Sequence, residues 1–160
     1  MSDPLATYLH DHLAGAVHAI ETLKAMRDRQ AGKPLGEFAA TLLVEVEADR
    51  DTLRKLAEST GAGSSRLKEG ASWLAERASR LKLTDESDHS IGTFEALEFL
   101  ELGIHGKWAL WCALDVAAVS DARLKGMDFK QLAERAETQR RLVNERRLEA
   151  ARRALLPEAE

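Results

Sequence analysis

Eight polar residues fall on or beside the apolar stripes that helical spacing predicts for this chain, where a polar group is costly: Asp49, Glu101, Asp115, Gln139, Arg140, Arg147, His12 and His105. Five of them, two carboxylates, two imidazoles and one guanidinium, could form a common site: Asp49, Glu101, His12, His105 and Arg140. Counted from the expected helix starts, Asp49, Glu101 and Arg140 lie at about the same height. Buried carboxylates are expected to be paired with a cation, with a metal or with each other. We therefore predict a buried polar cluster built from these five residues.

Arg140 is the cation of this cluster. A guanidinium can hold two carboxylates through its forked donors, so we predict that Arg140 bridges Asp49 and Glu101. His105 follows Glu101 by one helical turn and could complete a Glu-His ligand pair, with His12 nearby. A histidine beside a core is more often hydrogen-bonded than metallated, however. The pattern therefore favours a structural network, with no bound metal and no cofactor.

Other polar residues look like ligands but are not placed as ligands. His10 and His12 diverge by roughly 200° on a helix and cannot share one ion. His18, Glu21 and Glu47 fall far from the apolar stripes of their helices, so we expect them to be solvated.

Sequence motifs for covalent catalysis are missing. The chain has no Gly-x-Ser-x-Gly and no phosphate-binding glycine loop. Cys112 is the only cysteine, which excludes a disulfide within one chain and a cysteine-based zinc site. We expect Cys112 to be a small buried hydrophobe. Trp108 is expected in the core, and Trp111 either in the core or facing a partner subunit.

Helices must position all of these residues, because apolar side chains recur at steps of three and four along most of the chain. Asp3 followed by Pro4 marks one helix start, and Asp128 with Gln131 marks another. Gly32 separates the first two helices. The predicted helices span residues 4–30, 35–60, 66–82, 90–119 and 128–156.

Composition supports one globular domain over residues 1–160, since 44% of the residues are hydrophobic and 31% are charged. No apolar run approaches the roughly 20 residues of a membrane span, and the first residues do not resemble a signal peptide, which predicts a cytoplasmic location. The formal charge of -4 argues against nucleic-acid binding by the whole surface.

Two long helices, a long connection and two more long helices follow one another as in ferritin-like bundles with one crossover. On this order the chain resembles the ferritin-like superfamily over nearly its whole length. The resemblance implies an all-α fold, an antiparallel four-helix bundle with the short helix 66–82 in the crossover. Metalloproteins of the superfamily bind iron or manganese with Glu-x-x-His motifs. The nearest matches, Glu47 to Arg50 and Glu137 to Arg140, have arginine, which offers no lone pair to a metal.

The sequence therefore favours a non-enzymatic ferritin-like bundle of unknown role, with no intact di-metal site. One alternative is an iron- or manganese-dependent oxidoreductase or metal-storage protein that uses His12, Asp49, Glu101 and His105. Another is a binding module that uses the basic helix 128–156, with its three Arg-Arg pairs. Apolar residues outside the main stripe also predict a homodimer, because such residues are often buried against a second copy. These residues are Phe99, Leu102, Leu110 and Leu114.

Overall fold

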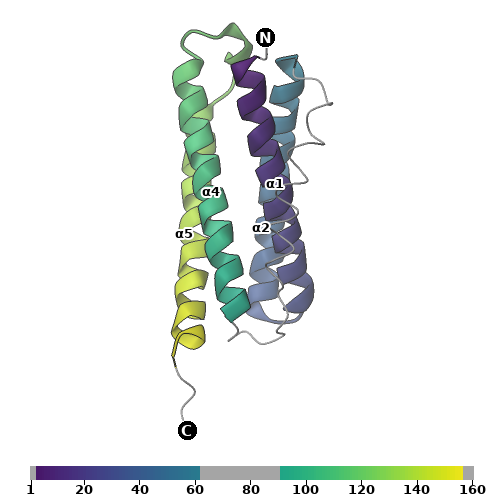
Figure 1. Cartoon of the computed structure of the whole chain (residues 1–160), viewed down its shortest axis with the longest axis vertical. Helices are drawn as coiled ribbons and strands as arrows, with labels where there is room; N and C mark the ends of the chain where they lie inside the picture. The colour runs from purple at the N-terminus through teal and green to yellow at the C-terminus, as the bar shows by residue number, and fades with distance from the viewer. Residues whose placement is uncertain (1–2, 62–90, 157–160) are drawn as a thin grey trace.

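The computed structural model describes residues 3–61 and 91–156, and all regular secondary structure in these ranges is helical. Four long helices lie side by side along one axis (Figure 1). They are α1 (Pro4–Arg29), α2 (Pro34–Ser59), α4 (Ile91–Ala117) and α5 (Phe129–Ala154), with a 3-10 turn η2 (Ala122–Leu124) before α5. The prediction of an all-helical bundle is confirmed. The helix predicted over 66–82 lies outside the described residues.

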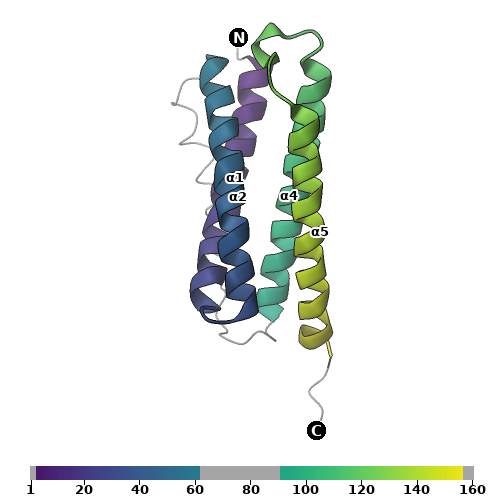
Figure 2. The ribbon, with the colours of Figure 1, turned by 180° about the vertical axis from the view of Figure 1, so that it is seen from behind.

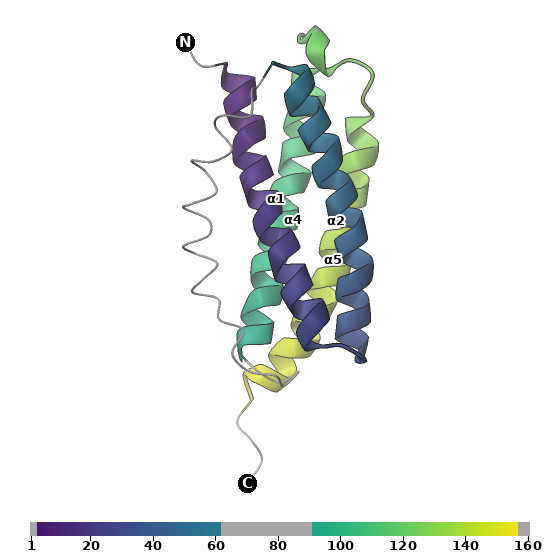
Figure 3. The same cartoon turned by 90° about the vertical axis from the view of Figure 1, so that its right-hand side faces the viewer.

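The chain runs down α1 and up α2 in Figure 1, then up α4 and down α5, as the reverse view in Figure 2 also shows. Residues 30–33 join the first pair at one end of the bundle, and residues 118–128 join the second pair at the other end. α1 packs against α2, α4 packs against α5, and α1 also contacts α4. Figure 3 shows α1 and α2 in front of α4 and α5.

Capping residues define where the helices begin. The Asp3 carboxylate accepts a hydrogen bond from the Leu5 backbone N–H at 3.0 Å, and Asp128 accepts one from the Gln131 backbone N–H at 3.0 Å. Each cap satisfies a backbone donor that has no partner within the helix. Both starts were predicted from these residues.

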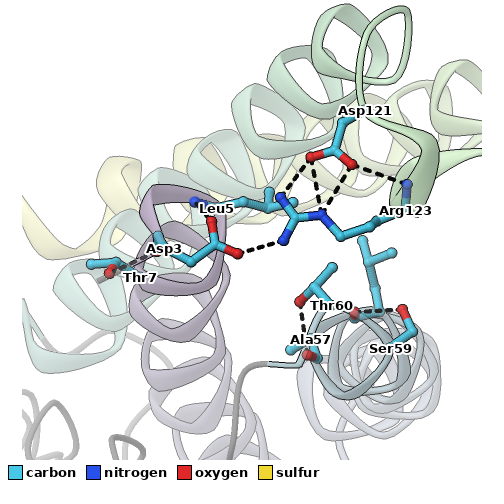
Figure 4. A network of polar contacts seen from close by, with 9 residues as sticks. Asp3, Leu5, Thr7, Ala57, Ser59, Thr60, Asp121 and Arg123 are labelled. Atoms are coloured by element: carbon cyan, nitrogen blue, oxygen red, sulfur yellow. Dashed lines mark hydrogen bonds and ion pairs between the residues drawn. The ribbon is translucent and has the colours of Figure 1, made fainter. Parts of the chain in front are cut away.

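A polar network ties the start of α1 to the connection between α4 and α5 (Figure 4). Arg123 of η2 pairs with Asp121, 2.7 Å away, and with Asp3. The hydrogen bond from Arg123 lowers the pKa of the Asp3 carboxyl. At the nearby end of α2, the Thr60 hydroxyl donates to the Ala57 carbonyl oxygen at 2.8 Å.

The apolar core consists of two clusters that divide the bundle along its length. The first, near the connection between α1 and α2, includes Leu23, Leu42, Val46, Leu97, Ile104 and Val143. The second, towards the connection between α4 and α5, includes Leu13, Leu53, Leu110, Trp111, Phe129 and Ala136. Among the described helices, none combines the length and apolarity that a membrane span requires.

Two of the four apolar residues from which we predicted a homodimer are buried in this core instead. Leu110 and Leu114 are each 1% exposed and pack in the second cluster, because α4 contacts both α1 and α5 and so has a wide buried face. Leu102 is 61% exposed, and Phe99 is half-buried. Trp111 is in the core.

Two other expectations are met only in part. Trp108 and Cys112 are half-buried against the second cluster, whereas the sequence predicted that both would be in the core.

Candidate functional site at the centre of the bundle

Three polar side chains, from three different helices, meet where one apolar cluster gives way to the other. Lys107 Nζ of α4 lies 2.5 Å from Asp49 Oδ2 of α2 and 2.5 Å from Gln139 Oε1 of α5. Asp49 is 2% exposed and Gln139 is 1% exposed. We refer to Asp49, Lys107 and Gln139 as the polar centre.

Helical spacing explains why these side chains point inward. Each one occupies a position of an apolar stripe at steps of three and four residues, where the helix must face the core. Asp49 lies between Val46 and Leu53, and Gln139 lies between Ala136 and Val143. Lys107 lies between Ile104 and Leu110, and its long apolar stem can cross the core while the ammonium group reaches the carboxylate.

Two further residues complete the pairing of the polar centre. Arg135, one turn before Gln139 on α5, donates to Asp49 Oδ1, so each oxygen of this carboxylate has a cationic partner. The Gln139 amide donates to Glu45 Oε2 at 2.8 Å and to Asp49 Oδ2 at 3.3 Å. A buried carboxylate that is paired in this way is compensated for its loss of hydration.

Burial and the neighbouring carboxylates act in opposite directions on Lys107. Burial lowers the pKa of the Lys107 ammonium to about 7, and Glu45 opposes this by raising it. The 2.5 Å contact with Asp49 also favours the charged form. Within the polar centre, Lys107 and Asp49 therefore form an ion pair, and burial removes water from around the Lys107 ammonium group.

A cavity of about 120 Å³ lies beside the polar centre, between α1, α2 and α4. Asp49 and Lys107 line it, together with His12. The His12 ring is half-buried and edge-on to Tyr8, with ring centroids 4.7 Å apart. Burial lowers the pKa of His12, and Asp11 acts in the opposite direction. His12 and Asp49 therefore line the same cavity.

The predicted bridge from Arg140 to both carboxylates is wrong for Asp49. Arg140 pairs with Glu101 at 2.8 Å and with Glu137 at 2.7 Å. Arg140 follows Gln139 by one residue, a rotation of about 100° around α5, so it faces Glu101 of α4 while Gln139 faces Asp49. The structure thus separates the predicted cluster into two networks, one around Asp49 and one around Arg140.

His105 lies outside the network around Asp49. Its ring is exposed and stacks on Trp108, with centroids 5.2 Å apart. His105 precedes Lys107 by two residues, which is a rotation of about 200° around α4, so the two side chains point to opposite sides of the helix. His105 therefore points away from the polar centre. The expectation that His105 lies in the buried cluster is therefore wrong.

His18 was expected in solvent and is instead 6% exposed. Its ring lies edge-on to Phe99 of α4, with centroids 4.5 Å apart. α1 contacts α4 as well as α2, and a single apolar stripe does not account for the second contact. Glu21 is exposed as predicted, whereas Glu47 is half-buried.

Sequence reasoning missed Lys107 and Arg135 as partners of Asp49, because Arg140 was taken as the cation that compensates this carboxylate. Lys107 carries a signal that could have found it. It is the only lysine or arginine in α4, and it lies on the apolar stripe three residues after Ile104. Arg135 gives no comparable signal, since its own position is exposed and only its guanidinium reaches Asp49.

The arginines of α5 are largely engaged in ion pairs with acidic residues. Besides the Arg140 pairs, Arg146 pairs with Glu149 at 3.2 Å, and Arg147 pairs with Glu98 at 3.0 Å. Both members of the Arg146-Arg147 pair and one member of the Arg140-Arg141 pair are thus neutralised by nearby carboxylates. This pairing argues against a basic surface dedicated to nucleic acid.

The arrangement can compensate buried charge and can offer hydrogen-bond donors to a small molecule. Within residues 3–61 and 91–156, no three His, Cys, Asp or Glu side chains are grouped so that they could hold a metal ion. Comparison with known proteins adds no family to this description. No protein-family model matches the chain, and the comparisons with curated proteins and with solved structures found no match.

Proposed function

We propose that this chain is a non-enzymatic bundle of ferritin-like arrangement, in which an ion-pair network occupies the level where related metalloproteins hold two metal ions. One observation carries the proposal: both oxygens of the buried Asp49 carboxylate are paired with cations, Lys107 and Arg135. A carboxylate that is neutralised in this way has little to gain from a metal, since binding one would require breaking both pairs.

The ferritin-like arrangement is supported by the path of the chain. Two helix pairs are joined by short connections at opposite ends of the bundle, and residues 62–90 lie between them in the sequence (Figure 1). Antiparallel pairs that are linked by one crossover have this order.

The placement of the four alternative metal ligands argues against a metal-dependent enzyme. Glu101 is paired with Arg140, and His105 is exposed on α4. Only His12 and Asp49 share the cavity. Two ligands are fewer than the three or more that a stable iron, manganese or zinc site uses.

Elemental analysis tests this proposal. The full-length chain is expressed with added iron, manganese and zinc, purified without chelator, and compared with Asp49→Ala. We expect less than about 0.1 metal ions per chain in both proteins. Stoichiometric metal in the wild type that disappears in Asp49→Ala would contradict the proposal, and so would metal-dependent oxidase activity lost in the same variant.

The chain also forms a homodimer in this proposal, through the face of α4 that carries the exposed Leu102. A leucine that is 61% exposed beside the half-buried Phe99 leaves apolar surface that a two-fold partner could cover. Light scattering across micromolar concentrations should give twice the chain mass, and Leu102→Glu should give one chain mass. A wild-type monomer at every concentration would exclude the dimer.

A further inference from the structure

The cavity beside Lys107 has an apolar wall that ends at the polar centre. Its volume of about 120 Å³ is similar to that of an engineered protein cavity, about 150 Å³, that binds benzene. Its apolar wall comes from α1, α2 and α4 and includes Ala16, Ala19, Val46, Leu53, Phe99 and Ile104. This wall suits a compact hydrocarbon group.

Two hydrogen-bond donors at the cavity lack a full set of acceptors. The Lys107 ammonium has three N–H groups, and within the described residues two acceptors meet it, Asp49 and Gln139. The indole N–H of Trp111, which also lines the cavity, is buried with no acceptor in the same part of the chain. Trp111 follows Lys107 by four residues, so both donors lie on one face of α4. A ligand at this place should therefore bring acceptors.

Lys107 is the cation of the polar centre that faces the cavity. Its ammonium group contacts one oxygen of Asp49, and Arg135 contacts the other oxygen of the same carboxylate. Glu45, which joins this network through Gln139, raises the pKa of Lys107. Arg50 also lines the cavity and is balanced by Asp51, 2.9 Å away. A ligand carboxylate in the cavity would share the Lys107 ammonium with Asp49.

Two glycines leave the cavity rim without side chains. Gly15 of α1 and Gly103 of α4 are exposed and line the cavity, and no atom of the described residues lies within 4 Å of where a Cβ would be. Glycine inside a helix costs roughly 0.5–1 kcal/mol relative to alanine, and packing in the described structure does not require it here. Within residues 3–61 and 91–156, no side chain fills the rim at these two positions, so a small molecule could enter there.

We propose that this cavity binds a small monocarboxylate with a compact apolar body. Its carboxylate accepts hydrogen bonds from Lys107 and Trp111, and its body packs against the wall that includes Val46 and Phe99. The inference goes beyond the proposed function and adds to the Asp49 ion pairs the cavity, its apolar wall and the buried indole N–H of Trp111. A metal-free chain that binds no carboxylate would leave the proposed function intact.

Calorimetry on the full-length chain tests this site with three carboxylate probes, butyrate, isovalerate and benzoate, each compared with the alcohol of the same skeleton. We expect one of the three acids to bind at one per chain, at least about tenfold more tightly than its alcohol, because a charge-assisted hydrogen bond is lost in the alcohol. The same acid should shift the Trp111 indole N–H resonance, assigned with Trp111→Phe.

Two variants of α4 locate the site without depending on the ion pair. Gly103→Leu should fill the rim and abolish binding. Gly106→Leu is the matched control, since Gly106 also has no atom of the described part of the chain within 4 Å of its missing Cβ but does not line the cavity. This variant should bind as the wild type does. Circular dichroism confirms that both variants are folded.

Lys107→Met should weaken acid binding about tenfold or more and leave binding of the alcohol unchanged. Three results would overturn the proposal. They are no binding of any of the three acids at millimolar concentration, equal binding of acid and alcohol, and binding that survives Gly103→Leu.

Discussion

Asp49 of α2 and Lys107 of α4 form an ion pair across the middle of the bundle, with 2.5 Å between Oδ2 and Nζ and side-chain exposures of 3% and 15%. This pair lies where the first apolar cluster ends and the second begins. It joins the two helix pairs, which otherwise contact each other mainly through α1 and α4. The stability of the bundle should therefore depend strongly on it.

Lys107→Met should destabilise the protein by about 3 kcal/mol, because it leaves the buried Asp49 with one cation in place of two. This value is at the low end for breaking a buried pair, since Arg135 still contacts the carboxylate. Urea unfolding at neutral pH measures the loss. Lys130→Met, at an exposed position of α5, is the control and should change stability by less than about 0.5 kcal/mol. Equal losses in the two variants would show that the pair does not stabilise the bundle.

Arg140→Leu should lower the melting temperature by less than Lys107→Met does. Arg140 pairs with Glu101 and Glu137, and both the arginine and Glu137 are partly in solvent, where an ion pair contributes little. Thermal unfolding of both variants, with the exposed Arg141→Leu as control, gives the order. If Arg140→Leu were the more damaging change, Arg140 and not Lys107 would be the main partner of the buried carboxylates.

The helices and the burial of Asp49 are the parts of this structure that the sequence alone predicts. The heptad-like spacing of apolar residues predicts the four long helices to within two residues at the ends that the structure describes. The same spacing identifies Asp49 as buried, because helix position alone determines which way its side chain points.

The partner of Asp49 could not be found in that way. Lys107 and Arg140 are both long cations near the same height, and the choice between them depends on how α4 and α5 are rotated about their axes. The arrangement of residues around one helix does not determine how that helix is rotated relative to its neighbours. The burial of His18 was missed for a related reason, because it depends on the contact between α1 and α4.

His18 should make the protein less stable in mild acid. Burial lowers the pKa of its ring below the ordinary value of about 6.5. Between the folded pKa and about 6.5, the unfolded chain binds more protons than the folded chain, so the free energy of unfolding falls as the pH falls through that window. His12, whose pKa is also lowered by burial, acts in the same direction.

Urea unfolding at pH 7.5 and pH 5 measures this loss in the wild type and in His18→Phe. The variant should lose less stability between the two pH values, because one buried imidazole no longer has to remain neutral. His105→Gln, at an exposed position, should behave as the wild type does. An unchanged loss in His18→Phe would mean that the His18 ring is as readily protonated in the folded state as in water.

A double-mutant cycle on Asp49 and Lys107 tests most directly whether an ion pair holds the centre of this bundle. Urea unfolding is measured for the wild type, Asp49→Asn, Lys107→Met and the double variant. We predict that the double variant loses less stability than the sum of the single losses, by about 1–3 kcal/mol, because each single change leaves one member of the buried pair without its partner and the double change removes both members. Losses that add to within about 0.5 kcal/mol would show that Lys107 does not neutralise Asp49 and would contradict the account.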